Sequence, residues 1–152
     1  MRYFIYGYYG YGNFGDDLLL HVLVRGIRSR DTRATFVIHN LNPVQGLERE
    51  PYVRFTNVAR KLMGLRRHSW RIVSYLRQVA AGLALSDVMV IGGGTLFLDK
   101  GRLNPSLCFL YLMVLYARWH HLPVIITGVG IDDLRHPISR WVTRGILKRA
   151  HY

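Results

Sequence analysis

Hydrophobic residues follow two alternating patterns along the chain. Short continuous apolar runs, rich in Val, Ile and aromatic residues, are typical of strands buried in a parallel sheet. They predict strands at Arg2–Tyr6, Ala34–Ile38, Asp87–Ile91 and Pro123–Thr127. Longer segments with helical spacing predict helices at Asp16–Ser29, Trp70–Leu83, Pro105–His120 and from Pro137 onward. Strands that alternate with helices in this way predict an α/β fold, a Rossmann-like open parallel sheet with helices on both faces.

The same pattern predicts which helix faces are buried. In the first helix, Leu19, Leu23 and Ile27 share one face. In the last helix, one stripe is apolar and the opposite stripe is basic. The apolar stripe consists of Ile138, Trp141, Val142, Gly145 and Ile146. Residues 40–56 contain two prolines and show no clear period, so we expect a long loop there.

Three of the predicted strands run directly into glycine-rich turns. The first turn spans Gly7–Gly15, the second is Gly92-Gly93-Gly94-Thr95, and the third is Gly128-Val129-Gly130. Parallel strands bring their C-terminal ends to one edge of the sheet, where open α/β folds bind ligands. The sequence therefore predicts a binding crevice along this edge.

The first turn matches the spacing of a dinucleotide-binding fingerprint, Gly10-x-Gly12-x-x-Gly15. That fingerprint places a pyrophosphate on the helix N-terminus, but Asp16 and Asp17 occupy this position and would repel it. It also needs an acidic residue at the end of the second strand, where this chain has His39. We therefore expect no nicotinamide or flavin cofactor.

Composition narrows the class of protein. The chain has 152 residues, half of them hydrophobic, which is enough for one domain with a real core. Its formal net charge of +12 favours anionic partners, although arginines on solvent-facing helix surfaces would give the same charge. Its single cysteine, Cys108, rules out a disulfide within the chain. No spacing of His, Cys and Asp is typical of a metal site, so we expect none.

The sequence also carries expectations about location. The longest apolar run, Leu107–Ala117, is shorter than the roughly 20 residues that a membrane span needs. The first strand leaves no room for a signal peptide, so we expect a cytoplasmic protein. A basic segment predicts peripheral attraction to the inner membrane face. Its cations are Lys61, Arg66, Arg67 and Arg71.

The three turns resemble those of the polysaccharide pyruvyl transferase family. The matching motifs are Asn13-Phe14-Gly15-Asp16-Asp17, Gly92-Gly93-Gly94-Thr95-Leu96 with Asp99 shortly after it, and Gly128-Val129-Gly130-Ile131. Their order and spacing agree along almost the whole chain. The proline that often follows the third turn in the family is absent, and Asp132 and Asp133 stand there instead.

The resemblance implies an activity and an architecture. Family members transfer a pyruvyl group from phosphoenolpyruvate to two hydroxyls of a sugar, without a metal or redox cofactor. They resemble GT-B glycosyltransferases, in which two Rossmann-like domains face a cleft. The cations that hold phosphoenolpyruvate lie largely beyond the region matched here. We therefore expect residues 1–152 to be the N-terminal domain, cut before a second domain, inactive alone and supplying the acceptor side of the site.

The resemblance also assigns candidate roles. Asp16 or Asp17 would act on a sugar hydroxyl, although either could instead serve the helix N-terminus alone. The predicted substrate-binding residues are Gly12, Asn13, Gly15, His39, Gly92, Gly93, Gly94, Thr95, Asp99, Gly128 and Gly130. Asn13 could instead hold a left-handed αL turn, and Asp99 could merely cap a turn. Tyr8, Tyr9 and Tyr11 could stack on a sugar face or line the second domain, although tyrosines more commonly lie in the core or at the surface.

Two other functions fit parts of the sequence. A GT-B-type glycosyltransferase would use a nucleotide sugar in place of phosphoenolpyruvate. A non-catalytic basic module would bind nucleic acid or anionic lipid through charge alone. The second alternative leaves the glycine turns without a purpose, and no nucleic-acid-binding motif is present. The partner that the family resemblance implies is a sugar acceptor of a cell-surface polysaccharide, linked to a lipid or a nucleotide.

Overall fold

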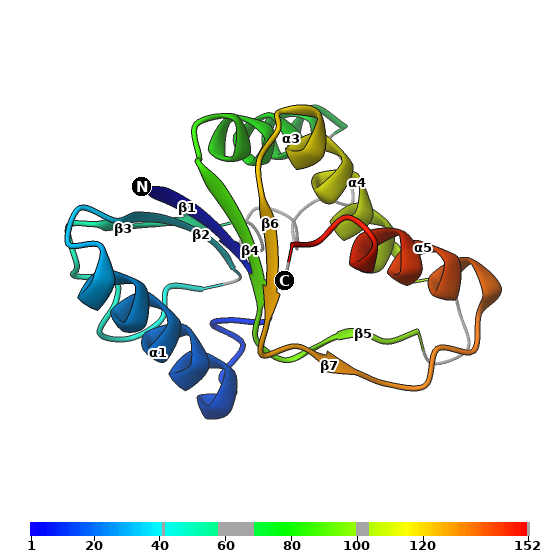
Figure 1. Ribbon diagram of the computed structural model, residues 1–152, viewed down its shortest axis with the longest axis horizontal. Helices are drawn as coiled ribbons and strands as arrows, with labels where there is room; N and C mark the ends of the chain where they lie inside the picture. Colours follow the sequence, from blue (N-terminus) through cyan, green and yellow to red (C-terminus); the bar gives the residue numbers. More distant parts are fainter. Residues whose placement is uncertain (41, 58–68, 100–103, 152) are drawn as a thin grey trace.

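The computed structural model is built on a five-stranded parallel sheet with the order β3-β2-β1-β4-β6 (Figure 1). It describes residues 1–40, 42–57, 69–99 and 104–151, without the side chains of residues 40, 57 and 69–75. The strands are β1 (Arg2–Tyr6), β2 (Thr35–Asn40), β3 (Val53–Asn57), β4 (Val88–Gly92) and β6 (Val124–Thr127). The first strand is thus central, with Tyr6 opposite His39 of β2 on one side and Ile91 of β4 on the other. This arrangement confirms the predicted Rossmann-like open sheet.

Helices cover both faces of the sheet (Figure 1). They are α1 (Phe14–Arg30), α3 (Ser69–Ala84), α4 (Pro105–Trp119) and α5 (Pro137–Leu147). Successive side chains of a strand point to opposite faces, so Ile5 packs with α1 while its neighbour Phe4 packs with the other three helices. In β4, Val90 packs on the α1 side of the sheet and Ile91 packs on the opposite side. The protein therefore has two hydrophobic cores separated by the sheet.

The apolar run around Cys108 forms the interior of α4. Its buried side chains lie in the core shared with α3 and α5, and they include Leu107, Leu110, Met113 and Val114. Asn104 caps the helix, because its side chain accepts a hydrogen bond from the backbone N–H of Ser106 at 3.0 Å. Among the helices that the structure describes, none is long and apolar enough to cross a bilayer.

Two of the predicted helix faces are wrong in detail. In α1 the fully buried residues are Leu20 and Val24, whereas Leu19 is 45% exposed and Leu23 and Ile27 are only partly buried. In α5 the predicted apolar stripe is rotated toward solvent. Ile138 and Trp141 are exposed, and the buried residues are Ser139, Val142, Thr143 and Ile146. Hydrophobic spacing failed here because two of the four buried side chains carry hydroxyl groups.

Three short strands were not predicted. The expected loop at residues 40–56 contains most of β3, an edge strand whose Val53 and Phe55 pack on the α1 side of the sheet. The other two strands, β5 (Thr95–Phe97) and β7 (Gly130–Ile131), pair in parallel as a separate small sheet. With three and two residues, β5 and β7 are too short to show a pattern, and β3 lacks the continuous apolar run that predicted the other strands of the main sheet.

Candidate active site

The three glycine turns lie together at the C-terminal edge of the sheet, as predicted. They are also hydrogen-bonded to one another. The backbone N–H of Tyr8 in the first turn donates to the carbonyl of Gly93 at 3.5 Å. The N–H of Gly130 in the third turn donates to the carbonyl of Gly94 at 2.9 Å. The second turn is therefore the centre of the candidate site.

Tyr9 locks the first turn against the second. Its side chain is buried in a slot lined by Gly7, Gly92 and Gly93. A Cβ added to Gly7 would lie 2.4 Å from the Tyr9 ring, and one added to Gly93 would lie 2.3 Å from it. Burial, and next the charge of Asp16, raise the pKa of the Tyr9 hydroxyl. Tyr9 is thus a neutral core residue, and the idea that it stacks on a sugar is wrong.

Asp16 lies where the first and second turns meet. Its Oδ2 accepts a 2.7 Å hydrogen bond from the side-chain amide of Asn13. The same oxygen is 3.1 Å from where a Cβ on Gly94 would stand, and Gly94 has a φ of +70°. A side chain at position 94 would therefore be strained and would press on the carboxylate. Glycine at position 94 lets the second turn approach the Asp16 carboxylate closely.

Asn13 orients this carboxylate while capping α1. Its side-chain oxygen accepts a hydrogen bond from the backbone N–H of Gly15 at 3.2 Å, as an N-cap residue does. Its amide nitrogen is then directed to Asp16. The expected left-handed turn at Asn13 is wrong, because its φ of −91° is that of extended backbone. Its binding to a sugar stays a prediction.

Asp17 has a different environment. Its Oδ1 accepts a 2.8 Å hydrogen bond from the backbone N–H of Gly10, across the first turn. The carbonyl of Gly10 in turn accepts a 2.9 Å hydrogen bond from the side chain of Asn42. Asp17 therefore holds the turn closed. The contribution from Asn42 could not be predicted, because this residue lies in the segment without periodicity.

Aromatic side chains stand beside Asp16 on the surface. The rings of Tyr8 and Tyr11 lie 5.1 Å apart at an angle of 56°, and Tyr11 is exposed. Phe14, the first residue of α1, is almost fully exposed. Gly12, Asn13 and Gly15 are exposed as well. Exposed rings, exposed glycines and the hydrogen-bonded Asn13 and Asp16 side chains thus belong to the same short segment.

The second and third turns are joined through the small sheet. Thr95 pairs with Gly130, and a Cβ on Gly130 would lie 2.8 Å from the Thr95 hydroxyl. Gly128 is exposed and lies at the end of β6, close to Leu19 of α1. These predicted substrate-binding residues thus share one edge with Asp16.

Asp99 is buried and faces the start of α5. Its Oδ1 accepts a hydrogen bond from the backbone N–H of Arg135 at 3.2 Å, and its Oδ2 accepts one from His136 at 2.8 Å. His136 is the N-cap of α5. A carboxylate that binds backbone N–H groups here stabilises the helix N-terminus. A role for Asp99 toward the acceptor stays a prediction.

His39 lies at the end of β2, beneath aromatic rings. It stacks on Tyr6 at 5.4 Å and on Phe4 at 6.1 Å. Burial lowers its pKa to about 4, so the imidazole is neutral at pH 7. Nδ1 of His39 is hydrogen-bonded to the Thr56 hydroxyl at 3.1 Å, and this hydroxyl donates to the carbonyl of Ile38 at 3.3 Å. The neighbours of His39 thus include aromatic rings and Thr56, and its predicted binding role stays a prediction.

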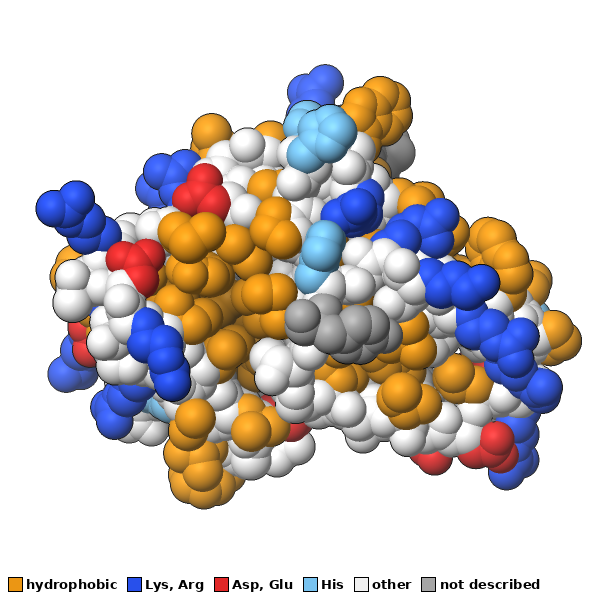
Figure 2. Space-filling model, in the orientation of Figure 1, with side chains coloured by type: hydrophobic (Ala, Val, Ile, Leu, Met, Phe, Trp, Pro, Cys, Tyr) orange, Lys and Arg blue, Asp and Glu red, His pale blue; other side chains and the backbone are white. Residues whose placement is uncertain are grey.

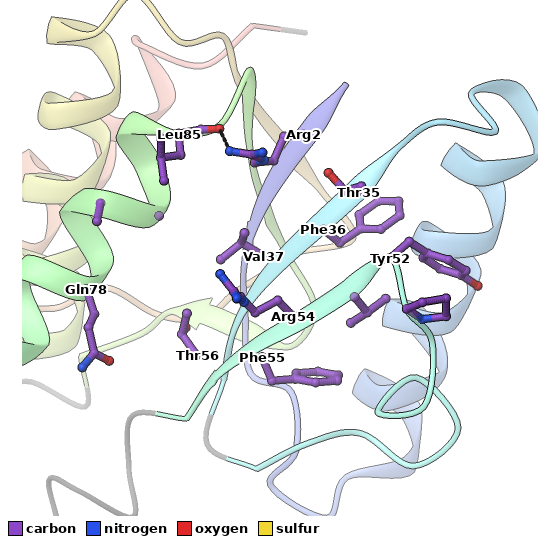
Figure 3. A pocket seen from close by; sticks show the side chains of 14 residues that line it. Arg2, Thr35, Phe36, Val37, Tyr52, Arg54, Phe55, Thr56, Gln78 and Leu85 are labelled. Atoms are coloured by element: carbon purple, nitrogen blue, oxygen red, sulfur yellow. Dashed lines mark hydrogen bonds between the residues drawn. The ribbon is translucent and has the colours of Figure 1, made fainter.

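A groove of about 850 Å³ lies between β3 and α3 (Figure 3). Arg54 extends from β3 into it, and Gln78 of α3 and Leu85, just after the end of α3, also line it (Figure 3). Arg2 closes one end by donating to the carbonyl of Leu85 at 2.8 Å. None of the predicted site residues is among the described residues that line this groove, and Thr56, which does line it, is hydrogen-bonded to His39. The groove is therefore separate from the edge that carries the glycine turns.

No cluster of three or more metal-binding side chains occurs within the described ranges. The basic segment that contains Lys61, Arg66 and Arg67 lies outside them, and so does the side chain of Arg71.

Comparison with known proteins adds the family. No curated protein matches the sequence. The sequence model of the family described as polysaccharide pyruvyl transferase matches residues 13–152. The matched region begins at Asn13 and includes Asp16, Asp17, the second glycine turn and the third glycine turn. Because the match covers nearly the whole chain, this protein belongs to the polysaccharide pyruvyl transferase family.

Proposed function

We propose that this chain takes part in moving the pyruvyl group of phosphoenolpyruvate onto two hydroxyls of one sugar. The enol carbon of the donor forms two new C–O bonds to the sugar and loses its bond to phosphate. One hydroxyl proton ends on the donor methylene, which becomes a methyl group, and the other leaves with phosphate. No atom is oxidised or reduced overall, so the reaction needs no redox cofactor.

One observation carries the proposal for this chain. In a member of the pyruvyl transferase family, a carboxylate lies at the junction of two glycine turns, where open sheets bind ligands. Asn13 fixes one oxygen of Asp16, and no hydrogen bond to the other oxygen is present in the described part of the chain. That oxygen is available to accept the proton of an acceptor hydroxyl.

The neighbouring residues support an acceptor role for this edge. Exposed Tyr11 and Phe14 offer ring faces beside polar groups, a combination suited to a sugar, which has both apolar and hydroxyl-bearing surfaces. Asn13 and Thr95 add amide and hydroxyl groups. We propose that the acceptor lies over the first and second turns, with its reacting hydroxyl at Asp16.

The part of the site that binds phosphoenolpyruvate needs other side chains than the part that binds the sugar. Phosphoenolpyruvate carries a phosphate and a carboxylate, which Lys and Arg side chains bind best. The three glycine turns contain no Lys or Arg and carry the carboxylates of Asp16 and Asp17 nearby. We therefore propose that the cations holding the donor come from a second domain facing this edge, as in a GT-B arrangement.

The acceptor is proposed to be a lipid- or nucleotide-linked precursor of a cell-surface polysaccharide. Such precursors carry phosphate groups, and the net charge of +12 favours anionic partners. Reaction with a precursor would place the protein in the cytoplasm, at or near the inner face of the membrane.

The experiment is a donor comparison with the full-length protein. Phosphoenolpyruvate and a set of nucleotide sugars are each supplied with sugar acceptors of different linkage. Release of phosphate together with a new ketal methyl signal in the NMR spectrum is expected only with phosphoenolpyruvate. Transfer of a sugar from a nucleotide donor, without ketal formation, would replace this proposal with the glycosyltransferase alternative.

A further inference from the structure

The outer face of α5 has a composition that the fold does not require. The helix buries Ser139, Val142, Thr143 and Ile146 against the core. Arg140, Arg144 and Lys148 follow one another at intervals of four residues, so they form a row along the exposed side. Trp141, which is 63% exposed, and Ile138, which is 49% exposed, lie beside this row. The exposed half of α5 is thus basic with an apolar margin.

The positive charge of this face is not neutralised. Residues 134–151 include five Lys and Arg residues and no Asp or Glu. Among the described Lys and Arg side chains, the one that forms an ion pair is Arg135, which binds Asp133 in the loop before the helix. Arg140 donates to the backbone carbonyls of Leu134 and Arg135, which hold its guanidinium in place without removing its charge. Figure 2 shows Lys and Arg side chains in a row over the part of the molecule where Figure 1 places α5.

Trp141 is held at the surface by its neighbours. Its ring meets that of Tyr111 edge-on at 5.4 Å, and the guanidinium of Arg149 lies 5.6 Å from the same Tyr111 ring. Tryptophan beside a row of cations is typical of helices that lie in the membrane interface, where the ring sits at the level of the headgroups. Binding to a nucleic acid or another polyanion would use the cations and leave Trp141 and Ile138 without a role.

We propose that the exposed face of α5 docks onto the surface of an anionic lipid bilayer. Arg144 and Lys148 contact lipid phosphates, and Trp141 and Ile138 enter the headgroup region. This surface differs from the basic segment around Lys61 that the sequence predicted. The proposal does not depend on the pyruvyl transfer reaction, because binding to lipid is measured without substrate.

The charge contribution is tested by co-sedimentation with vesicles. The protein is mixed with vesicles of phosphatidylcholine alone or with phosphatidylglycerol added. A double variant, Arg144→Gln with Lys148→Gln, is expected to bind the anionic vesicles about thirtyfold more weakly, since each surface cation contributes about 1 kcal/mol. The control removes two exposed cations elsewhere, Arg25→Gln with Arg33→Gln, and is expected to change binding less than about threefold. Equal losses in both double variants, or equal binding to neutral vesicles, would overturn the proposal.

The apolar contribution separates a membrane from other polyanions. Trp141→Ser is expected to weaken binding to anionic vesicles and to remove the blue shift of tryptophan fluorescence on binding. Trp119→Ser, at an 82% exposed position at the end of α4, is the matched control and should preserve both. Melting temperatures of the two variants are compared to exclude unfolding. Unchanged vesicle binding by Trp141→Ser, with equally tight binding to heparin or DNA, would assign α5 to a general polyanion surface and refute the membrane contact.

Discussion

The carboxylate of Asp17 binds the backbone N–H of Gly10 at 2.8 Å, which ties the start of α1 to the turn that precedes it. Asp16, the adjacent residue, instead faces the second glycine turn. Two aspartates that are equivalent in the sequence therefore have separate environments, and they are expected to respond differently to substitution.

Asp17→Ala is expected to destabilise the protein. It removes a hydrogen bond to a charged acceptor, a loss of about 1.5–3 kcal/mol in the free energy of unfolding. Asp17→Asn is the milder control, because its amide oxygen can still accept from Gly10. Urea unfolding of both variants measures the effect. Equal stability of Asp17→Ala and the unchanged protein would show that this bond does not hold the turn.

Asp16→Asn is expected to reduce turnover by roughly a hundredfold or more in the full-length enzyme, because an amide cannot accept the hydroxyl proton. Its melting temperature should change little, since an exposed charge at a helix start contributes about 0.3–1 kcal/mol. Asp17→Asn measured in parallel should retain most of the turnover. Near-normal turnover of both variants would remove the acceptor-site interpretation of the first turn.

Gly93→Ala is expected to cost about 2–4 kcal/mol, from overpacking against the Tyr9 ring and from a φ of +75°. Gly26→Ala is the matched control, because a Cβ there meets nothing within 4 Å. In the middle of α1 that change should stabilise the protein by roughly 0.5–1 kcal/mol. Thermal unfolding distinguishes the two, and a tolerated Gly93→Ala would mean that the Tyr9 slot is not tight.

Acidification is expected to destabilise the fold through His39. Its pKa is about 4 in the folded protein and about 6.5 when exposed, so the unfolded chain binds more protons between these values. The stability from keeping His39 neutral is complete above pH 6.5 and is lost as the pH falls toward 4. The loss between pH 7 and pH 5 should be about 2 kcal/mol. In His39→Phe this part of the pH dependence should be absent from urea unfolding curves.

Asp99→Ala tests whether Asp99 is structural. It would leave the N–H groups of Arg135 and His136 without these acceptors, at a cost of about 2–5 kcal/mol. Asp99→Asn keeps one accepting oxygen and should lose less. Turnover should fall only as far as the folded fraction falls. A variant with unchanged stability and strongly reduced turnover would instead support direct contact with the acceptor.

Much of the fold could be predicted because its main elements are long or continuously apolar. The buried strand at 88–92 and the helix at 105–119 need no tertiary information, since their hydrophobic residues fix their type. The buried face of α5 could be predicted only in part. Val142 and Ile146 belong to the predicted apolar stripe, but Ser139 and Thr143 are packed there without a hydrophobic signal. Strand β3 was hidden for a similar reason, as its exposed face carries Arg54 and Thr56.

The meeting point of the three glycine turns could be predicted from the sequence, because strand direction alone brings turns that follow parallel strands to one edge of the sheet. The surroundings of the individual residues of the candidate site could not. The different environments of Asp16 and Asp17 depend on side-chain directions at the first helical turn and on Asn42, which approaches from a distant segment. The burial of the Tyr9 side chain depends on a slot made by three glycines of two separate turns. Such contacts exist only after the strands have paired.

The central position of β1 has a consequence for folding during synthesis. The first strand made pairs with β2, which ends at Asn40, and with β4, which ends at Gly92. At a synthesis rate of about 5–20 residues per second, β4 follows β2 by about 3–10 s. During that time one edge of the central strand has no partner strand. A ribosome that pauses within the intervening segment would therefore prolong the exposure of an aggregation-prone edge, which chaperones of the nascent chain would have to cover.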